Sequence, residues 1–228
     1  MLHVMDLQLN YGKKQVLNGI SFHLKKGECI GILGTNGCGK STLLKILAGV
    51  LTPAAGTILY HGEDACSNPK LFVSYAGYVP QDNPLMEELT VKDNLRLWYA
   101  DSRADLNWEL EHGVLHMLKL HTVLKSRVST LSGGMKKRIS LGCALANQPS
   151  VLILDEPMSA LDLPCKEELR SYFQMHLQNG GAIVITTHEE PDLALCSQLY
   201  ALKQGILESI PGSIRGRQLS EFLQSDQR

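Results

Sequence analysis

The sequence predicts an α/β protein with a core in which helices cover a mostly parallel sheet, an N-terminal antiparallel β subdomain and an inserted α-helical subdomain. Three observations predict this arrangement. Apolar and polar residues alternate along residues 2–24, a glycine-rich loop at 34–42 joins an apolar run to a helical pattern, and residues 83–147 change to helical periodicity.

The N-terminal subdomain is predicted from a period of two residues, which is typical of strands that bury one face. The alternating apolar residues are Leu2, Val4, Leu7 and Leu9 in the first segment and Ile20, Phe22 and Leu24 in the second. Tyr11 and Gly12 are expected in the turn between these antiparallel strands. A further strand near 57–60 is expected to join them.

The glycine-rich loop follows the apolar run 29–33, which is of the buried-strand type. It reads Gly34-Thr35-Asn36-Gly37-Cys38-Gly39-Lys40-Ser41-Thr42, the pattern of a P-loop. Its glycines let successive backbone N–H groups point inward, and the next helix adds its positive N-terminal end, so an anion is expected to bind there. Lys40 is expected to reach the outer phosphates of a nucleoside triphosphate, and the Ser41 hydroxyl to ligate its Mg²⁺.

The helix after the loop is predicted over 41–51. Its apolar face is expected to consist of Leu43, Leu44, Leu47 and Val50 or Leu51. Because a strand-type run precedes the loop and a helical pattern follows it, a chance glycine-rich turn is the disfavoured alternative.

The helical subdomain is predicted from apolar residues three and four positions apart. These residues are Leu95, Leu97 and Trp98, followed by Leu110, Val114, Leu115 and Leu118. Apolar runs of the buried-strand type return at 151–154 and 182–186, and each suits the middle of a parallel sheet. The chain from about Ser209 onward gives no structural prediction.

Two acidic residues, Asp155 and Glu156, directly follow the first of these runs. Carboxylates at the end of a buried strand are costly without a purpose. We expect Asp155 to hold Mg²⁺ through its water shell, and Glu156 to orient and deprotonate the water that attacks the terminal phosphate. Solvated acids that open a loop are the alternative, which the upstream P-loop disfavours.

A third motif reads Leu131-Ser132-Gly133-Gly134-Met135-Lys136-Lys137-Arg138 and opens a predicted helix with Ser132 as its N-cap. Alone, it indicates only a second anion site at a helix N-terminus. Together with the P-loop, the paired acids, Gln81 and His188, however, the chain resembles the nucleotide-binding subunits of ATP-binding cassette (ABC) proteins. The resemblance spans nearly the whole chain. The stretch from Gln81 to Leu95 resembles the coupling region of multidrug or haem-exporter-like subunits.

The resemblance implies roles for further residues. Tyr11 would stack on adenine, with a structural tyrosine as the alternative. Gln81 would sense Mg²⁺ and connect the core to the helical lobe, and His188 would contact the γ-phosphate. The loop Ser159-Ala160-Leu161-Asp162 would touch the ATP site of a neighbouring subunit.

The resemblance also implies that two chains act together. Ser132, Gly133 and Gly134 of a second subunit would cover the γ-phosphate, so that two ATP molecules lie between two chains. A homodimer is the simplest assembly, and pairing with another ABC ATPase subunit is the alternative. The glutamine usual at the end of this motif is Met135 here, so phosphate closure should survive while the efficiency of coupling stays open.

Composition agrees with a single globular domain over 1–228: 44% of the residues are hydrophobic, 20% are charged, and the net charge is −1. The expected parts are the core with the β subdomain, in 1–82 and 148–228, and the helical subdomain in 83–147. The near-neutral charge argues against direct nucleic-acid binding through a broad basic field. The six cysteines lack zinc-type spacing, which favours reduced thiols, and no apolar stretch approaches the roughly 20 residues of a membrane span.

We therefore expect an ATPase subunit that binds ATP and Mg²⁺ and powers transport through separate transmembrane permease subunits, on the cytoplasmic face of the membrane, with export favoured. The alternative is a soluble ABC ATPase that remodels ribosomes, DNA or iron–sulfur assembly complexes. A single cassette and the lack of a long coiled coil weigh against parts of that alternative. A small-molecule kinase would share only the P-loop.

Overall fold

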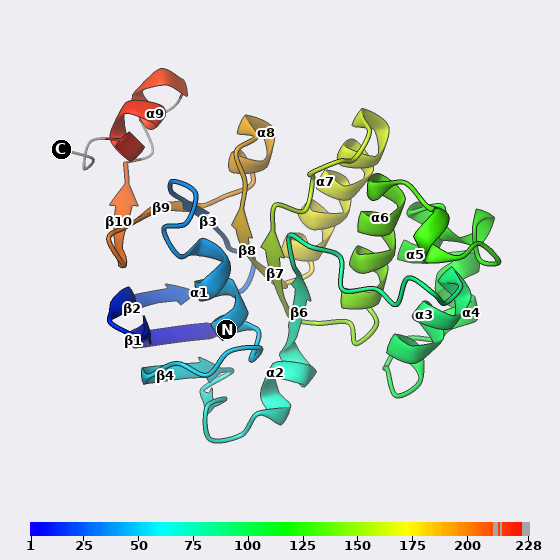
Figure 1. The fold of residues 1–228 in the computed structure, drawn as a ribbon, viewed down its shortest axis with the longest axis horizontal. Helices are drawn as coiled ribbons and strands as arrows, with labels where there is room; N and C mark the ends of the chain where they lie inside the picture. The colour runs from blue at the N-terminus through cyan, green and yellow to red at the C-terminus, as the bar shows by residue number, and fades with distance from the viewer. Residues whose placement is uncertain (212–213, 215, 225–228) are drawn as a thin grey trace.

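The computed structural model describes residues 1–211, 214 and 216–224, and contains an antiparallel and a mostly parallel sheet (Figure 1). The antiparallel sheet has the strand order β2-β1-β4-β5. Its strands are β1 (Leu2–Tyr11), β2 (Lys14–Leu24), β4 (Ala55–Tyr60) and β5 (Glu63–Asp64). The predicted N-terminal subdomain is confirmed, except that Tyr11 ends β1 and pairs with Lys14, so it lies outside the turn.

The second sheet has the order β10-β9-β3-β8-β7-β6. Its strands are β3 (Cys29–Leu33), β6 (Ala76–Val79), β7 (Val151–Asp155), β8 (Ala182–Thr186), β9 (Gln198–Lys203) and β10 (Ile206–Ile210). All neighbouring pairs are parallel except β10–β9. Because parallel strands end at the same edge, the segments that follow β3, β6, β7 and β8 meet there, at the edge where open α/β sheets bind ligands.

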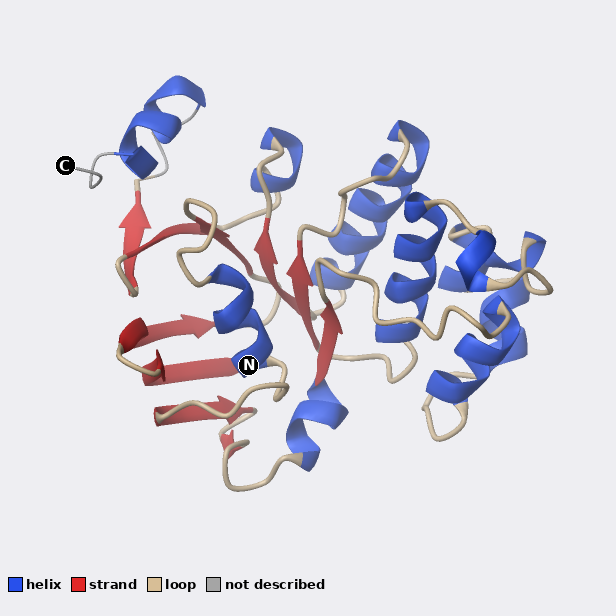
Figure 2. Cartoon of the chain, viewed as in Figure 1, coloured by secondary structure: helices blue, strands red, loops and turns tan. Residues whose placement is uncertain are grey.

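Helices lie on both faces of the parallel sheet (Figure 2). In chain order the helices are α1 (Lys40–Leu47), α2 (Lys70–Tyr75), α3 (Val91–Tyr99), α4 (Leu106–Glu111), α5 (Val114–Met117), α6 (Gly133–Ala144), α7 (Leu163–Gln178), α8 (Glu190–Leu193) and α9 (Gly216–Gln224). Helices α6 and α7 cover one face, whereas α1 lies on the other face together with the antiparallel sheet. Short 3₁₀ turns lie at Leu120–Thr122 and Val128–Thr130. Within the described part of the chain, no helix combines the length and apolar character that crossing a bilayer requires.

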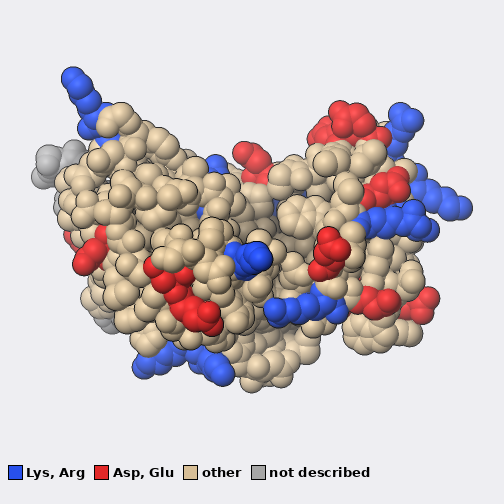
Figure 3. Space-filling view, turned by 90° about the horizontal axis from the view of Figure 1, so that it is seen from below, with Lys and Arg blue, Asp and Glu red and all other residues tan. Residues whose placement is uncertain are grey.

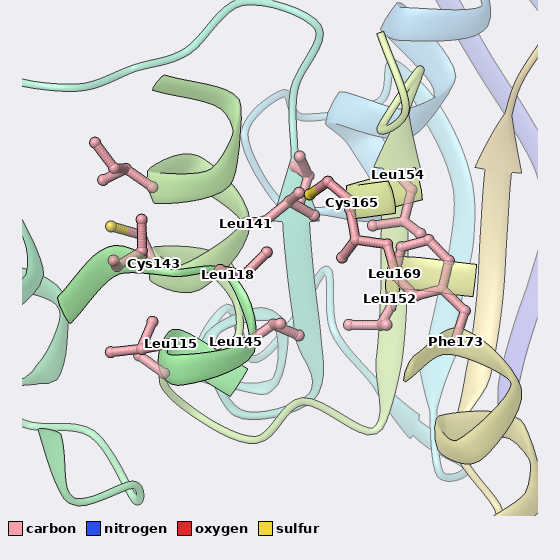
Figure 4. Close-up of a cluster of buried hydrophobic side chains, with 14 of the residues drawn as sticks. Leu115, Leu118, Leu141, Cys143, Leu145, Leu152, Leu154, Cys165, Leu169 and Phe173 are labelled. Carbon is pink, nitrogen blue, oxygen red and sulfur yellow. The ribbon is translucent and has the colours of Figure 1, made fainter. Parts of the chain in front are cut away.

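The strands of the parallel sheet send alternate side chains into two cores. Ile153 of β7 and Val184 of β8 pack with α1 and the antiparallel sheet. Leu152 and Leu154 point the other way and pack with α6 and α7, where Figure 4 shows them beside Leu169 and Phe173. Burial on both faces explains why β7 and β8 read as continuous apolar runs.

Two expectations for the helices need correction. Helix α1 ends at Leu47 and not at 51, because Gly49 takes a φ of +73° that only glycine adopts without strain. Of the two alternatives for its last apolar residue, Val50 is exposed, whereas Leu51 packs against the core. Leu97 and Trp98 are also exposed, since α3 buries a different face. The apolar residues of that face are Val91, Leu95 and Tyr99, which are four residues apart.

The chain after Ser209, which gave no prediction, ends β10 and forms α9. Leu219 of α9 packs with Leu33 and Leu193 in a third, smaller core. This core supports the end of β3 just before the glycine-rich loop.

Candidate nucleotide-binding site

The glycine-rich loop connects β3 to α1 and has the backbone that its glycines require. Gly34, Gly37 and Gly39 all have positive φ angles. A Cβ atom at Gly34 would lie 2.7 Å from the carbonyl oxygen of Leu202, so only glycine fits there. The Lys40 ammonium lies inside the loop and donates hydrogen bonds to the carbonyl oxygens of Gly34 (2.8 Å) and Thr35 (3.2 Å). The backbone of the loop therefore holds the Lys40 ammonium next to the cradle that the loop forms.

A cleft of about 460 Å³ opens over this loop, and we call it the ATP cleft. Its lining residues are Tyr11, Lys14, Val16, Asn36, Gly37, Gly39, Lys40, Ser41, Thr42, Gln81, Asp155 and Glu156. They come from the β subdomain, from the loop with the start of α1, and from the ends of β6 and β7. Of the predicted loop residues, Gly34, Thr35 and Cys38 do not line the ATP cleft. Lys14 and Val16 were missed, because only the pairing of β1 with β2 brings them beside Tyr11.

Asp155 ends β7 and is buried, with 2% of its surface exposed. Its Oδ1 accepts a hydrogen bond from the Thr186 hydroxyl at 2.7 Å, whereas its buried Oδ2 has no hydrogen-bond partner among the described residues. An unpartnered carboxylate oxygen beside a phosphate cradle fits a hydrated divalent cation, which prefers oxygen ligands. The Ser41 hydroxyl and the Gln81 amide line the same ATP cleft, so the donor set suits Mg²⁺.

Glu156 and His188 lie together at the outer edge of the site. Glu156 has a φ of +48°, and its backbone N–H donates to the carbonyl oxygen of Thr186 at 3.1 Å. This turn directs the carboxylate away from the strand, and its Oε1 lies 3.4 Å from Nε2 of His188. The predicted acid and histidine are therefore brought together.

The segment around His188 is held by a buried network that the sequence did not reveal. Asp192 is fully buried; its Oδ1 accepts from Nε of Arg170 at 2.7 Å, and its Oδ2 accepts from the Thr187 hydroxyl at 2.8 Å. Glu189 accepts from Arg170 as well, at 2.8 Å. Arg170 lies on α7 and Asp192 on α8, so their contact depends on the fold. The only signal in the sequence was the presence of an acid and an arginine, either of which would be costly to bury alone.

The Ser-Gly-Gly motif lies in a separate hollow of about 240 Å³, which we call the signature hollow. Its lining residues are Ser132, Gly134, Met135, Arg138, Ala160, Leu161 and Asp162, none of which lines the ATP cleft. Ser132 caps α6 by accepting a hydrogen bond from the Met135 N–H at 3.3 Å, as predicted. Arg138 donates to Oδ1 of Asp162 at 2.6 Å and ties α6 to the loop before α7. Within one chain, the structure joins Ser132 and Gly134 to Asp162 and not to the P-loop.

Comparisons with known proteins agree with this geometry. The ABC transporter family matches residues 17–159. The chain is 39% identical over 215 residues to Nod factor export ATP-binding protein I of Burkholderia orbicola, covering 92% of this chain and 70% of that protein. It is 38% identical to the protein of the same name in Paraburkholderia xenovorans, with 90% and 69% covered.

Solved structures are similar over almost the whole chain. An ATP-binding subunit of an ABC transporter superposes with a TM-score of 0.85 at 29% identity, covering 96% of this chain and 93% of the other. A dimeric ATP-binding cassette in a post-hydrolysis state, bound to ADP and phosphate, superposes with a TM-score of 0.79 at 25% identity, with 91% and 97% covered.

Proposed function

The chain belongs to the ABC transporter family, and from this premise we propose that it binds and hydrolyses ATP as one half of a two-chain sandwich that powers export through separate transmembrane subunits. The observation that carries the proposal is the ATP cleft, where Lys40, Ser41, Gln81, Asp155 and Glu156 converge from three segments of the chain. Each of these side chains has a function in phosphate transfer to water.

Binding begins at the P-loop. The backbone N–H groups of the loop and the N-terminus of α1 would cradle the phosphates, and Lys40 would turn from its own carbonyls to the outer phosphates. Tyr11, with 53% of its surface exposed beside the cleft, would stack on the adenine. Ser41, Gln81 and Asp155 would hold Mg²⁺, which supplies positive charge to the phosphate oxygens.

Hydrolysis needs a base next to the attacking water. Glu156 is the candidate, because its carboxylate faces the ATP cleft from the end of β7. His188, whose Nε2 lies 3.4 Å from Oε1 of Glu156, would orient that carboxylate and contact the γ-phosphate. The network around Asp192 would keep the histidine segment in place during these contacts.

The γ-phosphate needs a second cover, which the same chain does not provide. The signature hollow shares no residue with the ATP cleft, so a second copy of this chain, or another ABC ATPase subunit, would bring Ser132, Gly133 and Gly134 to it. Asp162 would lie in the same interface through its bond to Arg138. ATP would thus favour the closed pair, and hydrolysis would reopen it.

Transmembrane subunits are the proposed second partner, at the cytoplasmic face of the membrane. Leu97 and Trp98 of α3 and Met86 before it expose 50–55% of their surface, as a docking face for another protein would. Export is favoured because the relatives are named for export. On the face in Figure 3, basic and acidic side chains are interspersed.

The Glu156→Gln variant tests the mechanism. We expect it to bind ATP normally, to hydrolyse it at least about a hundredfold more slowly, and to double in mass by light scattering with ATP and Mg²⁺, since only proton transfer is lost. The matched control is Lys40→Ala, which should lose both nucleotide affinity and dimerisation because the outer phosphates lose their cation. A Glu156→Gln variant that stays monomeric at excess ATP would contradict the two-chain sandwich.

The transport proposal has its own test. Purification of this chain from its native cells in mild detergent, followed by mass spectrometry, should recover a protein with several membrane spans. Recovery of ribosomal, DNA-bound or iron–sulfur components in its place would favour the soluble remodelling alternative and leave the ATPase mechanism intact.

A further inference from the structure

Lys137, in the second turn of α6, is buried beneath the segment that carries Gln81. Only 1% of its surface is exposed. Its ammonium donates hydrogen bonds to the carbonyl oxygens of Pro80 (2.7 Å) and Gln81 (3.3 Å), the first two residues after β6. A contact 56 residues apart in sequence thus connects the helix of the Ser-Gly-Gly motif to the backbone of a residue that lines the ATP cleft.

The surroundings of this ammonium explain how a lysine can be buried there. Burial lowers the pKa of Lys137, and the carboxylates of Asp155, Glu156 and Asp82 oppose that shift. These acids lie at the ends of β7 and β6, so Lys137 faces the edge of the sheet where the ATP cleft is built. A buried lysine is costly unless hydrogen bonds and opposite charges compensate for lost water, and both are present here.

Lys136, the preceding residue, makes the contrast clear. Its ammonium forms an ion pair with Glu87 at 2.6 Å, and Glu87 is half exposed. Lys136 therefore supports the surface of the helical lobe, whereas Lys137 reaches the core. The two lysines give a matched pair with the same chemistry on the same helix.

We propose that Lys137 is a positioning residue that fixes the backbone of Gln81 to helix α6, so that the Gln81 side chain stays in the ATP cleft only while α6 is docked on the core. The inference rests on the proposed role of Gln81 toward Mg²⁺. Movement of the Ser-Gly-Gly motif and of Gln81 is then coupled within one chain. The coupling passes through two backbone carbonyls, so it does not depend on the side chain at Met135.

The test replaces Lys137 by Met, which keeps the length of the side chain and removes its donors. Two hydrogen bonds from a charged donor are lost, so the Mg²⁺ concentration that half-saturates nucleotide binding should rise by about tenfold to a hundredfold. Binding of a fluorescent ATP analogue, titrated with Mg²⁺, measures this directly. Hydrogen–deuterium exchange of the segment after β6 should also become faster. Lys136→Met should change neither quantity.

A double-mutant cycle with Gln81→Ala separates positioning from general stability. If Lys137 acts through Gln81, adding Lys137→Met to Gln81→Ala should not raise the half-saturating Mg²⁺ concentration any further. Additive losses, or a Lys137→Met variant with wild-type Mg²⁺ dependence and exchange, would overturn the proposal. Lys137→Arg, which keeps the charge and the donors, should restore most of the loss.

Two outcomes distinguish this inference from the function on which it rests. If Gln81→Ala itself has normal Mg²⁺ dependence, the proposed role of Gln81 fails. If Gln81→Ala is impaired and Lys137→Met is not, only the role of Lys137 fails. Should Lys137→Met not fold, Lys137→Gln takes its place in the cycle, and failure of both to fold would assign Lys137 to the core alone and overturn the proposal.

Discussion

Asp192 is predicted to contribute strongly to stability because it compensates a buried arginine. The perturbation is Asp192→Asn, which preserves the shape of the side chain and removes its charge. In the folded chain Asp192 accepts two hydrogen bonds, from Arg170 and from Thr187, and none of its surface is exposed. An asparagine has only one oxygen to accept with, so one of the two donors must lose its partner.

The size of the stability loss depends on the acidic partners that Arg170 keeps in the variant. Removing one partner of a buried ion pair costs about 3–5 kcal/mol when the other is left uncompensated. Arg170 keeps Glu167 and Glu189 on its other nitrogens, and asparagine keeps one acceptor. We therefore expect a loss of about 2–3 kcal/mol in the free energy of unfolding. For a chain of this size, that loss lowers Tm by about 4–12 °C.

Urea and thermal unfolding followed by circular dichroism measure this loss. The control is Glu167→Gln, which removes a different partner of the same arginine. The Glu167 side chain is 64% exposed, so its pair with Arg170 is screened by water and its loss should cost at most about 1 kcal/mol. An Asp192→Asn variant that unfolds within about 0.5 kcal/mol of the wild type, or a Glu167→Gln variant that loses as much stability as Asp192→Asn, would contradict this role of Asp192.

Two further predictions concern the signature hollow and the response to acid. A Cβ atom at Gly134 would lie 2.6 Å from the carbonyl oxygen of Ala160, so Gly134→Ala should displace the motif and abolish ATP-driven dimerisation in light scattering. A Gly134→Ala variant that still dimerises with ATP would contradict this geometry. Burial lowers the pKa of His176, so the unfolded chain takes up the proton first as the pH falls below about 6.5. The free energy of unfolding should decrease below that pH, and less steeply in His176→Gln; equal slopes would count against it.

The strands of the parallel sheet could be predicted because consecutive residues in each run are apolar. Runs such as 151–154 are apolar at every position, and the structure buries them on both faces. The loop chemistry at 34–42 was equally readable, since glycine and lysine at fixed spacing leave one backbone geometry. In both cases the information lies within about ten residues of chain.

The features that the sequence did not predict depend on partners far along the chain. Leu97 and Trp98 have the spacing of a buried helical face, yet the position of α6 decides that α3 packs through Leu95 and Tyr99. In the sequence, Lys137 looks like an ordinary surface lysine. Its burial depends on the two carbonyl oxygens after β6 that accept its hydrogen bonds. Local periodicity carries no information on such contacts, so burial of a charge appears only in the fold.

The geometry of the motif also explains why Met135 is compatible with an ATP-closing surface. The Ser132 oxygen accepts the Met135 N–H, which leaves its hydroxyl proton available to another acceptor. The first N–H groups of α6 have no partner within the helix, so they can face an anion. These donors belong to the backbone and to Ser132, and a methionine at position 135 removes none of them. What methionine does remove is an amide at the rim of the signature hollow, where a second chain would arrive. Any effect of this residue should therefore fall on communication between the two chains and not on retention of the phosphate.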